Sequence, residues 1–262
     1  MKVAVWNTGH FIADKVAESL LSLPNSTLFH AKSATRSIIK DHDIHIGYGI
    51  LRGMDDVFKA CDRDKKPWFD VDRGYFRPNH FGGTYRVTLS GTQPTNINID
   101  DYKTINKKVV DFDAKPWRGV DCSKSILICP PTDYAVDFFN INVDKWKDNF
   151  ARIAYDSGIK KYIFRPKGTE RPLQQDLDKA GLVVTFNSAV GWEAMRQGIP
   201  VMSDQDNSLI GSTCRGLTVH KTSELQRDIR LKLFNIMEDM QLTLKEMEDG
   251  KLWPLMQHLM SL

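Results

Sequence analysis

Residues 183–194, Val-Val-Thr-Phe-Asn-Ser-Ala-Val-Gly-Trp-Glu-Ala, decide the fold class. The apolar run Leu182–Phe186 is rich in β-branched residues, which is typical of a buried strand. Asn187 and Ser188 form a turn of small residues, and Ala189–Gln197 follows with the composition of a helix. A buried strand that runs through a short turn into a helix is the repeating step of parallel sheets covered by helices. This stretch therefore predicts an α/β fold.

The same alternation of short apolar runs and amphipathic stretches extends in both directions along the chain. The other expected strands are Lys2–Asn7, Ser26–His30, Asp43–Ile50, Pro67–Val71, Tyr85–Leu89, Ser125–Cys129, Lys161–Arg165 and Pro200–Ser203. The other expected helices are Phe11–Leu23, Met54–Asp62, Val143–Ser157, Leu173–Ala180 and a long C-terminal helix, Thr222–Met247, whose first residues are like a capping box. The pattern loosens between Asp72 and Asp121, where turn residues gather. We therefore predict two Rossmann-like domains, residues 1–120 and 121–262, with the C-terminal helix on the second.

The composition excludes several classes of protein. The chain has 262 residues, of which 41% are hydrophobic and 26% charged, as in soluble globular proteins and unlike disordered or collagen-like chains. The apolar runs are far shorter than the ~20 residues that span a bilayer, so we expect no membrane span. With no apolar signal-peptide stretch and four scattered cysteines, we expect a cytoplasmic protein with reduced thiols. The net charge of +3 neither indicates nor excludes a nucleic-acid partner, and the oligomeric state is not readable.

The turn at Ser188 is the first candidate binding site. Open α/β sheets bind ligands at the carboxyl ends of their strands, where loops run into helix N-termini. The free N–H groups of a first helical turn favour a phosphate, to which Ser188 can add a hydroxyl group. Glu193, near the start of the same helix, is placed to accept hydrogen bonds from ribose hydroxyls. The alternative is that Ser188 only caps the helix and that Glu193 is a solvated surface residue.

Residues 183–204, VVTFNSAVGWEAMRQGIPVMSD, resemble the nucleotide-sugar donor loop of GT-B glycosyltransferases, most closely that of the capsule-polysaccharide and Kdo-transferase-like group. Residues 68–91 and 241–259 are similar to stretches of small glycosyltransferase-like proteins encoded by bacteria and phages. Together the three patches cover about a quarter of the chain. The resemblance implies a GT-B-like architecture whose C-terminal domain binds a nucleotide sugar as the donor substrate, with no additional cofactor.

A basic turn in the same half of the chain agrees with this placement. Arg165 and Lys167 follow a predicted strand, and Arg171 lies close by. Two or three cations at a strand end can neutralise a diphosphate, and an arginine can do so with two hydrogen bonds. The Kdo-transferase-like group commonly has His-Pro at this point, whereas here Arg165 precedes Pro166, which leaves the donor class open. The alternative is an ordinary basic surface turn.

The N-terminal half is expected to supply the acceptor site and any catalytic base. In an inverting transfer, a carboxylate or a histidine removes the proton of the acceptor hydroxyl group. His10, in the turn after the first strand, and Asp72, at the end of the strand Pro67–Val71, are the main candidates, with Asp70 and His80 as further ones. The alternatives are that His10 caps a helix and that Asp72 is a turn residue paired with Arg73. A retaining transfer needs no such base.

Arg73, Tyr75 and Arg77 are the candidate acceptor-binding residues, because they lie in a basic and aromatic segment, residues 65–86. Such segments can stack bases or sugars and track phosphates, although aromatic residues more often pack the edge of a core. The resemblance to phage-encoded proteins implies that the acceptor is a modified base in phage DNA or, alternatively, a surface glycan. Two rivals to a glycosyltransferase stay open: a non-catalytic nucleic-acid-binding protein and a nucleotide-sugar epimerase or hydrolase of the same fold.

No metal site is expected. His42 and His45 are three residues apart in a stretch that is typical of a strand, where they would point to opposite faces. Asp70 and Asp72 have the spacing of a metal-binding Asp-x-Asp motif, but Arg73 follows directly. We therefore predict a metal-independent enzyme.

Overall fold

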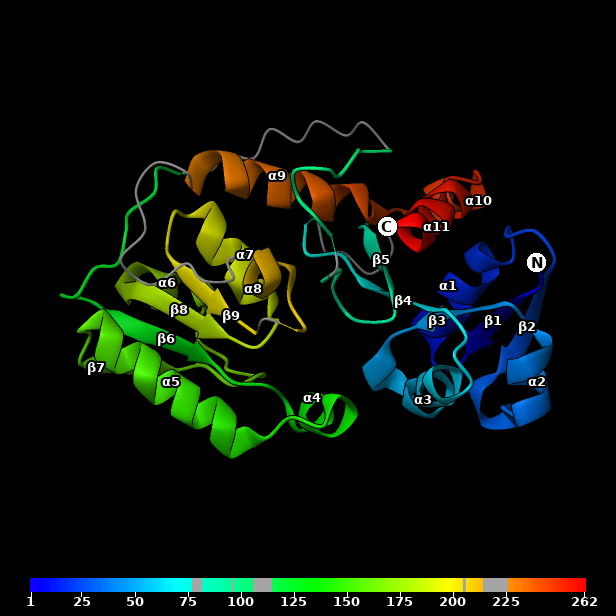
Figure 1. Cartoon of the computed structure of the whole chain (residues 1–262), viewed down its shortest axis with the longest axis horizontal. Helices are drawn as coiled ribbons and strands as arrows, with labels where there is room; N and C mark the ends of the chain where they lie inside the picture. Colours follow the sequence, from blue (N-terminus) through cyan, green and yellow to red (C-terminus); the bar gives the residue numbers. More distant parts are fainter. Residues whose placement is uncertain (77–81, 96, 106–114, 205, 214–225) are drawn as a thin grey trace. The chain divides into compact units, whose positions relative to one another are not determined.

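The computed structural model describes all residues except 77–81, 96, 106–114, 205 and 214–225 (Figure 1). The chain forms two compact units: unit 1 contains residues 1–94, 103–108 and 236–262, and unit 2 contains residues 95–102 and 109–235. These bounds differ from the predicted division at residue 120, because the last part of the chain returns to the first unit.

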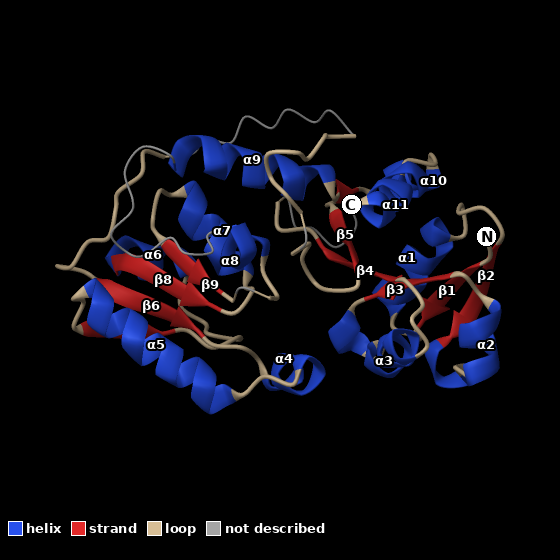
Figure 2. Ribbon diagram, in the orientation of Figure 1, coloured by secondary structure: helices blue, strands red, loops and turns tan. Residues whose placement is uncertain are grey.

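Unit 1 is built around a six-stranded sheet with the order β10-β5-β4-β3-β1-β2 (Figure 2). Its strands are β1 (Val3–Asn7), β2 (Ser26–His30), β3 (Ile44–Tyr48), β4 (Trp68–Arg73), β5 (Tyr85–Leu89) and β10 (Gln241–Leu242). The pairs among β1 to β4 are parallel, whereas β5 pairs antiparallel with both β4 and β10. The sheet of this unit is therefore mixed, and its parallel half contains the four strands that the sequence predicts.

The helices of unit 1 follow the amphipathic pattern. In α1, Ile12, Val16 and Leu20 are buried at a spacing of four residues, which places them on one face of the helix. The α-helices of this unit that precede the tail are α1 (Phe11–Leu20), α2 (Arg36–Asp41) and α3 (Asp55–Arg63), and two short 3-10 helices are Ala31–Ser33 and Ile50–Arg52. The sequence reasoning did not predict α2, which Thr35 caps by accepting from the Ile38 N–H group at 3.3 Å.

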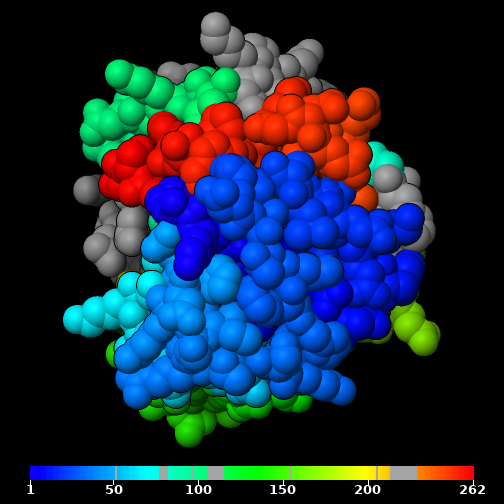
Figure 3. Space-filling view, turned by 90° about the vertical axis from the view of Figure 1, so that its right-hand side faces the viewer, coloured from blue at the N-terminus to red at the C-terminus, as the bar shows by residue number. Residues whose placement is uncertain are grey.

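The prediction of one C-terminal helix over Thr222–Met247 is wrong. The described part of this region contains α9 (Gln226–Asp239), the strand β10, α10 (Leu244–Glu248) and α11 (Leu252–Ser261). A capping box begins α10 at Thr243 and Glu246, while the expected one at residues 222–224 lies outside the described residues. Ser19 of α1 donates to Glu248 at 2.9 Å, so the C-terminal residues (red in Figure 3) pack on the N-terminal ones (blue). Pairing with β5 therefore replaces the helix that local pattern predicts.

Unit 2 contains a four-stranded parallel sheet with the order β7-β6-β8-β9. Its strands are β6 (Ser125–Cys129), β7 (Lys161–Phe164), β8 (Ala180–Thr185) and β9 (Val201–Ser203). Its helices are α4 (Asp133–Phe139), α5 (Val143–Ser157), α6 (Leu173–Lys179), α7 (Ala189–Arg196) and α8 (Leu209–Thr213), followed by most of α9. The parallel α/β architecture of this half is confirmed.

Apolar side chains fill both faces of the unit 2 sheet. On one face, Leu127 and Val183 pack with residues of α6 and α7. On the other, Ile128 and Leu182 pack with residues of α5. The predicted bounds of β2, β5, β6 and α5 are confirmed, and Gly158 ends α5 in the left-handed conformation with φ of 67°. Apart from the C-terminal helix, the other predicted elements differ by up to three residues at an end, while α4 and α8 were not among the predicted helices.

Among the described residues, no helix combines the length and the apolar character that a membrane span needs.

Candidate functional site

Ser188 lies at the carboxyl end of β8, where it caps α7. Its Oγ accepts a hydrogen bond from the Val190 N–H group at 3.2 Å, and its own N–H group donates to Thr185 Oγ1 at 3.2 Å. The turn from strand to helix thus has the predicted form. The cap uses one lone pair of the hydroxyl group, so Ser188 retains a donor for a ligand at the helix N-terminus.

Glu193 lies on α7, half-buried and already hydrogen bonded. Its Oε1 accepts from Arg196 Nη2 at 2.8 Å and from Gln197 Nε2 at 3.1 Å. Gln197 also exchanges hydrogen bonds with Gln174 of α6, at 2.7 and 3.1 Å. These contacts hold the carboxylate along the side of α7 that faces α6. Binding of ribose by Glu193 stays a prediction, and only its second oxygen is without these contacts.

The basic turn after β7 is organised by an acid that sequence reasoning missed. Asp176, on α6, receives hydrogen bonds from Arg165 Nη1 and Arg171 Nε, both at 2.6 Å. Burial acts to raise the pKa of Asp176, but the hydrogen bonds from Arg171 and Arg165 outweigh it and hold the pKa below its ordinary value. Asp176 thus neutralises much of the positive charge of the two arginines within the protein. Lys167 is exposed and, within the described residues, has no ion-pair partner.

A pocket of about 560 Å³ opens in unit 2 beside the carboxyl ends of β8 and β9. Its walls are formed by α5, by the segment between α4 and α5, and by the residues that follow β9. Thr185 lines the pocket and also binds the Ser188 N–H group. The pocket and the N-terminus of α7 therefore meet at the end of β8.

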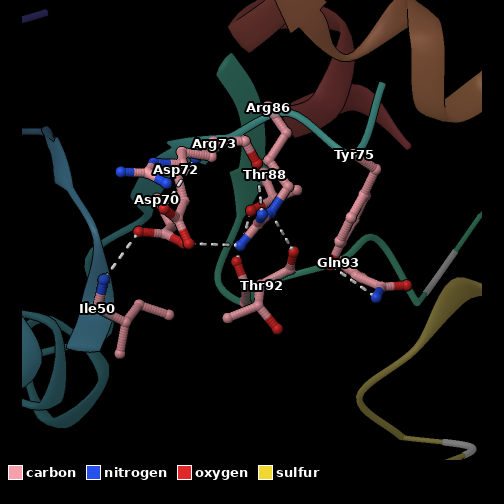
Figure 4. Close-up of polar contacts among 10 residues, drawn as sticks. Ile50, Asp70, Asp72, Arg73, Tyr75, Arg86, Thr88, Thr92 and Gln93 are labelled. Atoms are coloured by element: carbon pink, nitrogen blue, oxygen red, sulfur yellow. Dashed lines mark hydrogen bonds and ion pairs between the residues drawn. The ribbon is translucent and has the colours of Figure 1, made fainter. Parts of the chain in front are cut away.

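Two acidic side chains, those of Asp70 and Asp72, lie toward the C-terminal end of β4 in the unit 1 sheet (Figure 4). Asp70 of β4 is fully buried, and its Oδ1 accepts from the Ile50 N–H group at 3.0 Å. Burial and, second, the negative charge of Asp72 raise the pKa of Asp70 to about 7, although Arg86 opposes this. Asp70 is therefore a carboxyl group that can hold or release a proton near neutral pH.

Asp72 is half-buried and joined to Arg86 of β5, which lies directly opposite in the antiparallel pair. Arg86 Nη2 donates to Asp72 Oδ2 at 2.9 Å, and the Arg73 N–H group donates to Asp72 Oδ1 at 2.8 Å. Arg86 also lies over the ring of Tyr75, 4.7 Å from its centroid (Figure 4). Both oxygens of Asp72 are thus occupied, and its role as the base stays a prediction.

Arg86 and Tyr75 are packed inside unit 1. Arg86 donates to the carbonyl oxygens of Thr92 at 2.9 Å and Arg73 at 2.7 Å, and Gln93 Nε2 donates to the Tyr75 hydroxyl group at 2.8 Å. Arg73 and Tyr75 thus belong to this network. The third predicted acceptor residue, Arg77, and the further candidate His80 lie outside the described residues.

His10 is exposed and caps α1. Its Nδ1 accepts from the Ile12 N–H group at 3.3 Å, which places the ring proton on Nε2 in the neutral form. His10 can therefore take up a second proton only at Nδ1, at the expense of the cap. The predicted cap is present, and action as a base stays a prediction.

The two further histidines have structural surroundings. His45 is buried in β3, where Nδ1 accepts from Trp6 Nε1 at 3.2 Å and Nε2 faces the Ile39 carbonyl oxygen at 3.1 Å. Burial lowers the pKa of His45 to about 4. His42 ends α2 and contacts the Ile38 carbonyl oxygen at 2.8 Å. Throughout the described ranges, no group of three or more His, Cys, Asp or Glu side chains is placed to hold a metal ion.

The fold of this chain is similar to that of a solved Kdo transferase. KpsC of Thermosulfurimonas dismutans, in a structure named as a β-Kdo 2,7 transferase, matches 96% of this chain and 100% of its own at 11% identity and a TM-score of 0.52. Another KpsC structure from this organism, named as a β-Kdo 2,4 transferase, matches 88% of this chain and 89% of its own at 14% identity and a TM-score of 0.48.

The chain thus has an α/β fold that is similar to the fold of the β-Kdo 2,7 transferase structure. No protein-family model matches the sequence, and no curated protein does so either. The expected likeness to Kdo transferases is thus confirmed for the fold, while the likeness to phage-encoded proteins and the GT-B arrangement stay predictions.

Proposed function

We propose that this protein is a metal-independent glycosyltransferase that moves a sugar from a nucleotide-sugar donor to an acceptor. Unit 2 holds the donor, and unit 1 supplies the acceptor site. The observation that carries the proposal is the turn from β8 into α7. There Ser188 caps a helix N-terminus at the ligand-binding edge of a parallel sheet, in a chain whose fold is similar to that of a Kdo transferase.

The charged residues of unit 2 support a phosphate-bearing ligand. The ion pairs of Asp176 hold Arg165 and Arg171 in a fixed turn, from which Lys167 projects without an ion-pair partner among the described residues. A helix N-terminus and an unpaired cation favour an anion, which in a nucleotide sugar is the phosphate group.

For an inverting transfer, Asp70 is a better candidate for the base than Asp72 or His10. A base works best when its pKa lies near the pH of the reaction, and the pKa of Asp70 is about 7. Asp72 is bound on both oxygens, and His10 accepts a proton only by giving up its cap. The fully buried Asp70 must exchange its proton through a local opening of the edge.

We propose a glycan acceptor rather than a base in DNA. The expectation of DNA binding depends on the aromatic and basic residues of the segment 65–86. However, Trp68 stacks on Phe58 with ring centroids 4.3 Å apart, and both Tyr85 and Arg86 are buried. Buried rings and a paired guanidinium group are not available to stack bases or to bind the phosphate backbone. The described part of the segment 65–86 thus favours the packing interpretation.

The proposal is tested with radiolabelled uridine and cytidine sugar nucleotides. The intact chain is incubated with each donor, alone, with an oligosaccharide mixture or with duplex DNA, and the products are separated by chromatography. Label that moves to oligosaccharide supports the proposal. Free labelled sugar would indicate a hydrolase, an altered nucleotide sugar an epimerase, and labelled DNA the other acceptor.

Binding is measured separately by calorimetry. If Glu193 binds the ribose, as the sequence predicts, Glu193→Ala weakens nucleotide binding. The variant is expected to change the melting temperature little, because a half-exposed ion pair on one helix contributes less than about 1 kcal/mol. Absence of binding for every uridine and cytidine sugar nucleotide would refute the proposed function.

A further inference from the structure

The pocket beside α5 differs in chemistry from the helix N-terminus that it adjoins. Its floor is apolar, with Val184 of β8 and Met202 of β9, and its wall carries the aromatic rings of Trp146 and Phe150. These two rings are nearly parallel, 16° apart, and their centroids are 6.5 Å apart. A concave site of about 560 Å³ that joins this apolar and aromatic surface to polar residues has the size of a small-molecule site.

The helix α5 presents two neighbouring rows of residues to this pocket. Trp146, Phe150 and Ile153 form the apolar row, which packs on the sheet. Lys145, Asn149 and Arg152 form a polar row at the same spacing, one helical turn between members. Neither Lys145 nor Arg152 forms an ion pair with any residue that the structure describes. The pocket thus combines an apolar surface with two cations that form no ion pair with the described residues.

The opposite wall supplies a hydrogen-bond acceptor. Asp204 follows β9 and is half-buried, and its Oδ1 accepts from the Asn207 N–H group at 3.0 Å and from Asn207 Nδ2 at 2.9 Å. These bonds fix the carboxylate in the pocket wall. Its Oδ2 has no hydrogen bond to the described residues, so it is available to hydroxyl or amino groups of a ligand.

Three groups of a ligand are therefore specified together. A flat ring fits against the aromatic and apolar surface, hydroxyl or amino groups fit Asp204, and an anionic group fits Lys145 and Arg152. A nucleoside phosphate carries all three. Glu193, the residue expected to bind ribose, lies on α7, which packs on the other face of the sheet, and its Oε1 is taken by Arg196 and Gln197.

We propose that the pocket between α5 and the ends of β8 and β9 holds the base and ribose of the nucleotide, with Lys145 and Arg152 supplying positive charge for its phosphate. This inference rests on the proposed function, which it deepens by placing the nucleoside away from Glu193. Asn149 lies between the two cations, and Trp146 and Phe150 offer the surface for the base. Asp204 binds hydroxyl groups of the ribose or an amino group of the base.

The inference is tested by calorimetry on the intact chain, with UMP, CMP, AMP and GMP and the corresponding nucleosides as probes. In Lys145→Ala/Arg152→Ala, the affinity for the monophosphates is expected to fall about tenfold or more, while the affinity for the uncharged nucleosides changes less than about twofold. Lys147→Ala is the matched control, because Lys147 is exposed on α5, does not line the pocket and pairs with Asp144. It is expected to bind as the wild type does.

A second variant fills the pocket without altering the core. Asn149 is exposed on α5 and lines the pocket, so the ring in Asn149→Trp is expected to displace the base and to abolish binding of both monophosphates and nucleosides. Asp148→Trp adds the same ring at an exposed neighbouring position that does not line the pocket, and is expected to leave binding unchanged. The helical circular dichroism of both variants checks that they fold.

The outcomes separate this inference from the proposed function. Loss of binding in the pocket variants, with Glu193→Gln binding as the wild type does, supports the nucleoside position. Normal binding in both pocket variants, with loss in Glu193→Gln, overturns it and leaves the proposed glycosyltransferase intact. If the wild type binds neither monophosphates nor any nucleotide sugar, both fail.

Discussion

The two units end their parallel strands in different ways. In unit 1 the charged groups near the C-terminal ends of the strands are buried. Asp70 is fully buried, and Arg86 is buried against Asp72 and Tyr75. In unit 2 the corresponding edge has a capped helix N-terminus, the exposed Lys167 and a pocket. One edge is thus suited to holding a proton and the other to binding a charged ligand.

The difference follows from strand direction. In unit 1, β5 runs antiparallel beside β4, which places Arg86 directly opposite Asp72. The two side chains therefore form an ion pair across the strands. In unit 2 every strand is parallel, so each strand end continues into a loop and then into a helix. The same strand–helix plan therefore gives a sealed polar cluster in one unit and an open edge in the other.

The largest effect is expected for Asp70→Asn. The unfolded chain releases this proton near the ordinary pKa of 3.8, but the fold retains it up to about pH 7. The contribution of Asp70 to stability is therefore full below about pH 4 and is lost as the pH rises through about 7. Relative to the wild type, the variant should gain on the order of 4 kcal/mol in unfolding free energy between about pH 4 and pH 8, measured by urea unfolding. Parallel pH profiles would contradict the buried, protonated carboxyl group.

Asp176→Ala tests whether the cations of unit 2 are committed to the fold. Removing a buried acid that receives two arginines should lower the unfolding free energy by about 3 kcal/mol, less than for a sealed pair because Arg171 is 42% exposed. Asp178→Ala, an exposed acid on the same helix, should change it by less than about 0.5 kcal/mol. Equal small effects would mean that the turn after β7 is held by the backbone alone.

Gln241→Ala tests how the C-terminal strand is held in unit 1, because the Gln241 side chain joins β10 to the loop before β5 by a hydrogen bond. Its Oε1 accepts from the Phe76 N–H group at 3.0 Å, and its Nε2 donates to Glu238 at 3.2 Å. Leaving these groups without a partner should cost about 2 kcal/mol, and the Phe76 amide should exchange its hydrogen faster. Gln257→Ala, at an exposed position of α11, is the control, and unchanged exchange at Phe76 would rule out the tie.

Ser188→Ala is expected to have the smallest effect, about 1 kcal/mol, through loss of the N-cap of α7. Thermal unfolding measures it, and Ser188→Asp should restore the lost stability because aspartate also caps helices. If Ser188→Asp recovers stability but loses nucleotide binding by charge repulsion, the helix N-terminus serves as an anion site in addition to its role in folding. Equal nucleotide affinity in both variants would leave Ser188 a structural cap.

Local sequence pattern predicted the elements whose side chains follow their own periodicity. The alternation of apolar residues located β5, β6 and α5 with the observed bounds, and the cap residues Ser188 and Gly158 fixed helix ends. Thr243-Leu244-Lys245-Glu246 carried a readable capping box that would have divided the tail. The division of the C-terminal region into separate helices could thus have been predicted in part from the sequence.

The rest depended on contacts between distant residues. Gln241 has the polarity of a surface helix residue, yet it is buried because partners 165 and 157 positions away, Phe76 and Thr84, bind its side chain. Asp176 is an ordinary helix residue until the turn after β7 brings two arginines to it. Likewise, the raised pKa of Asp70 arises from burial within the complete sheet, which a single strand does not reveal.

The strand β10 has a consequence for biosynthesis. Residues 236–262 complete the sheet of unit 1, but the ribosome makes them only after all of unit 2. The outer edge of β5 therefore stays unpaired while the ribosome synthesises unit 2, at about 5–20 residues per second. Exposed strand edges invite pairing with other chains, so expression as a fragment that stops before Gln241 should favour aggregation.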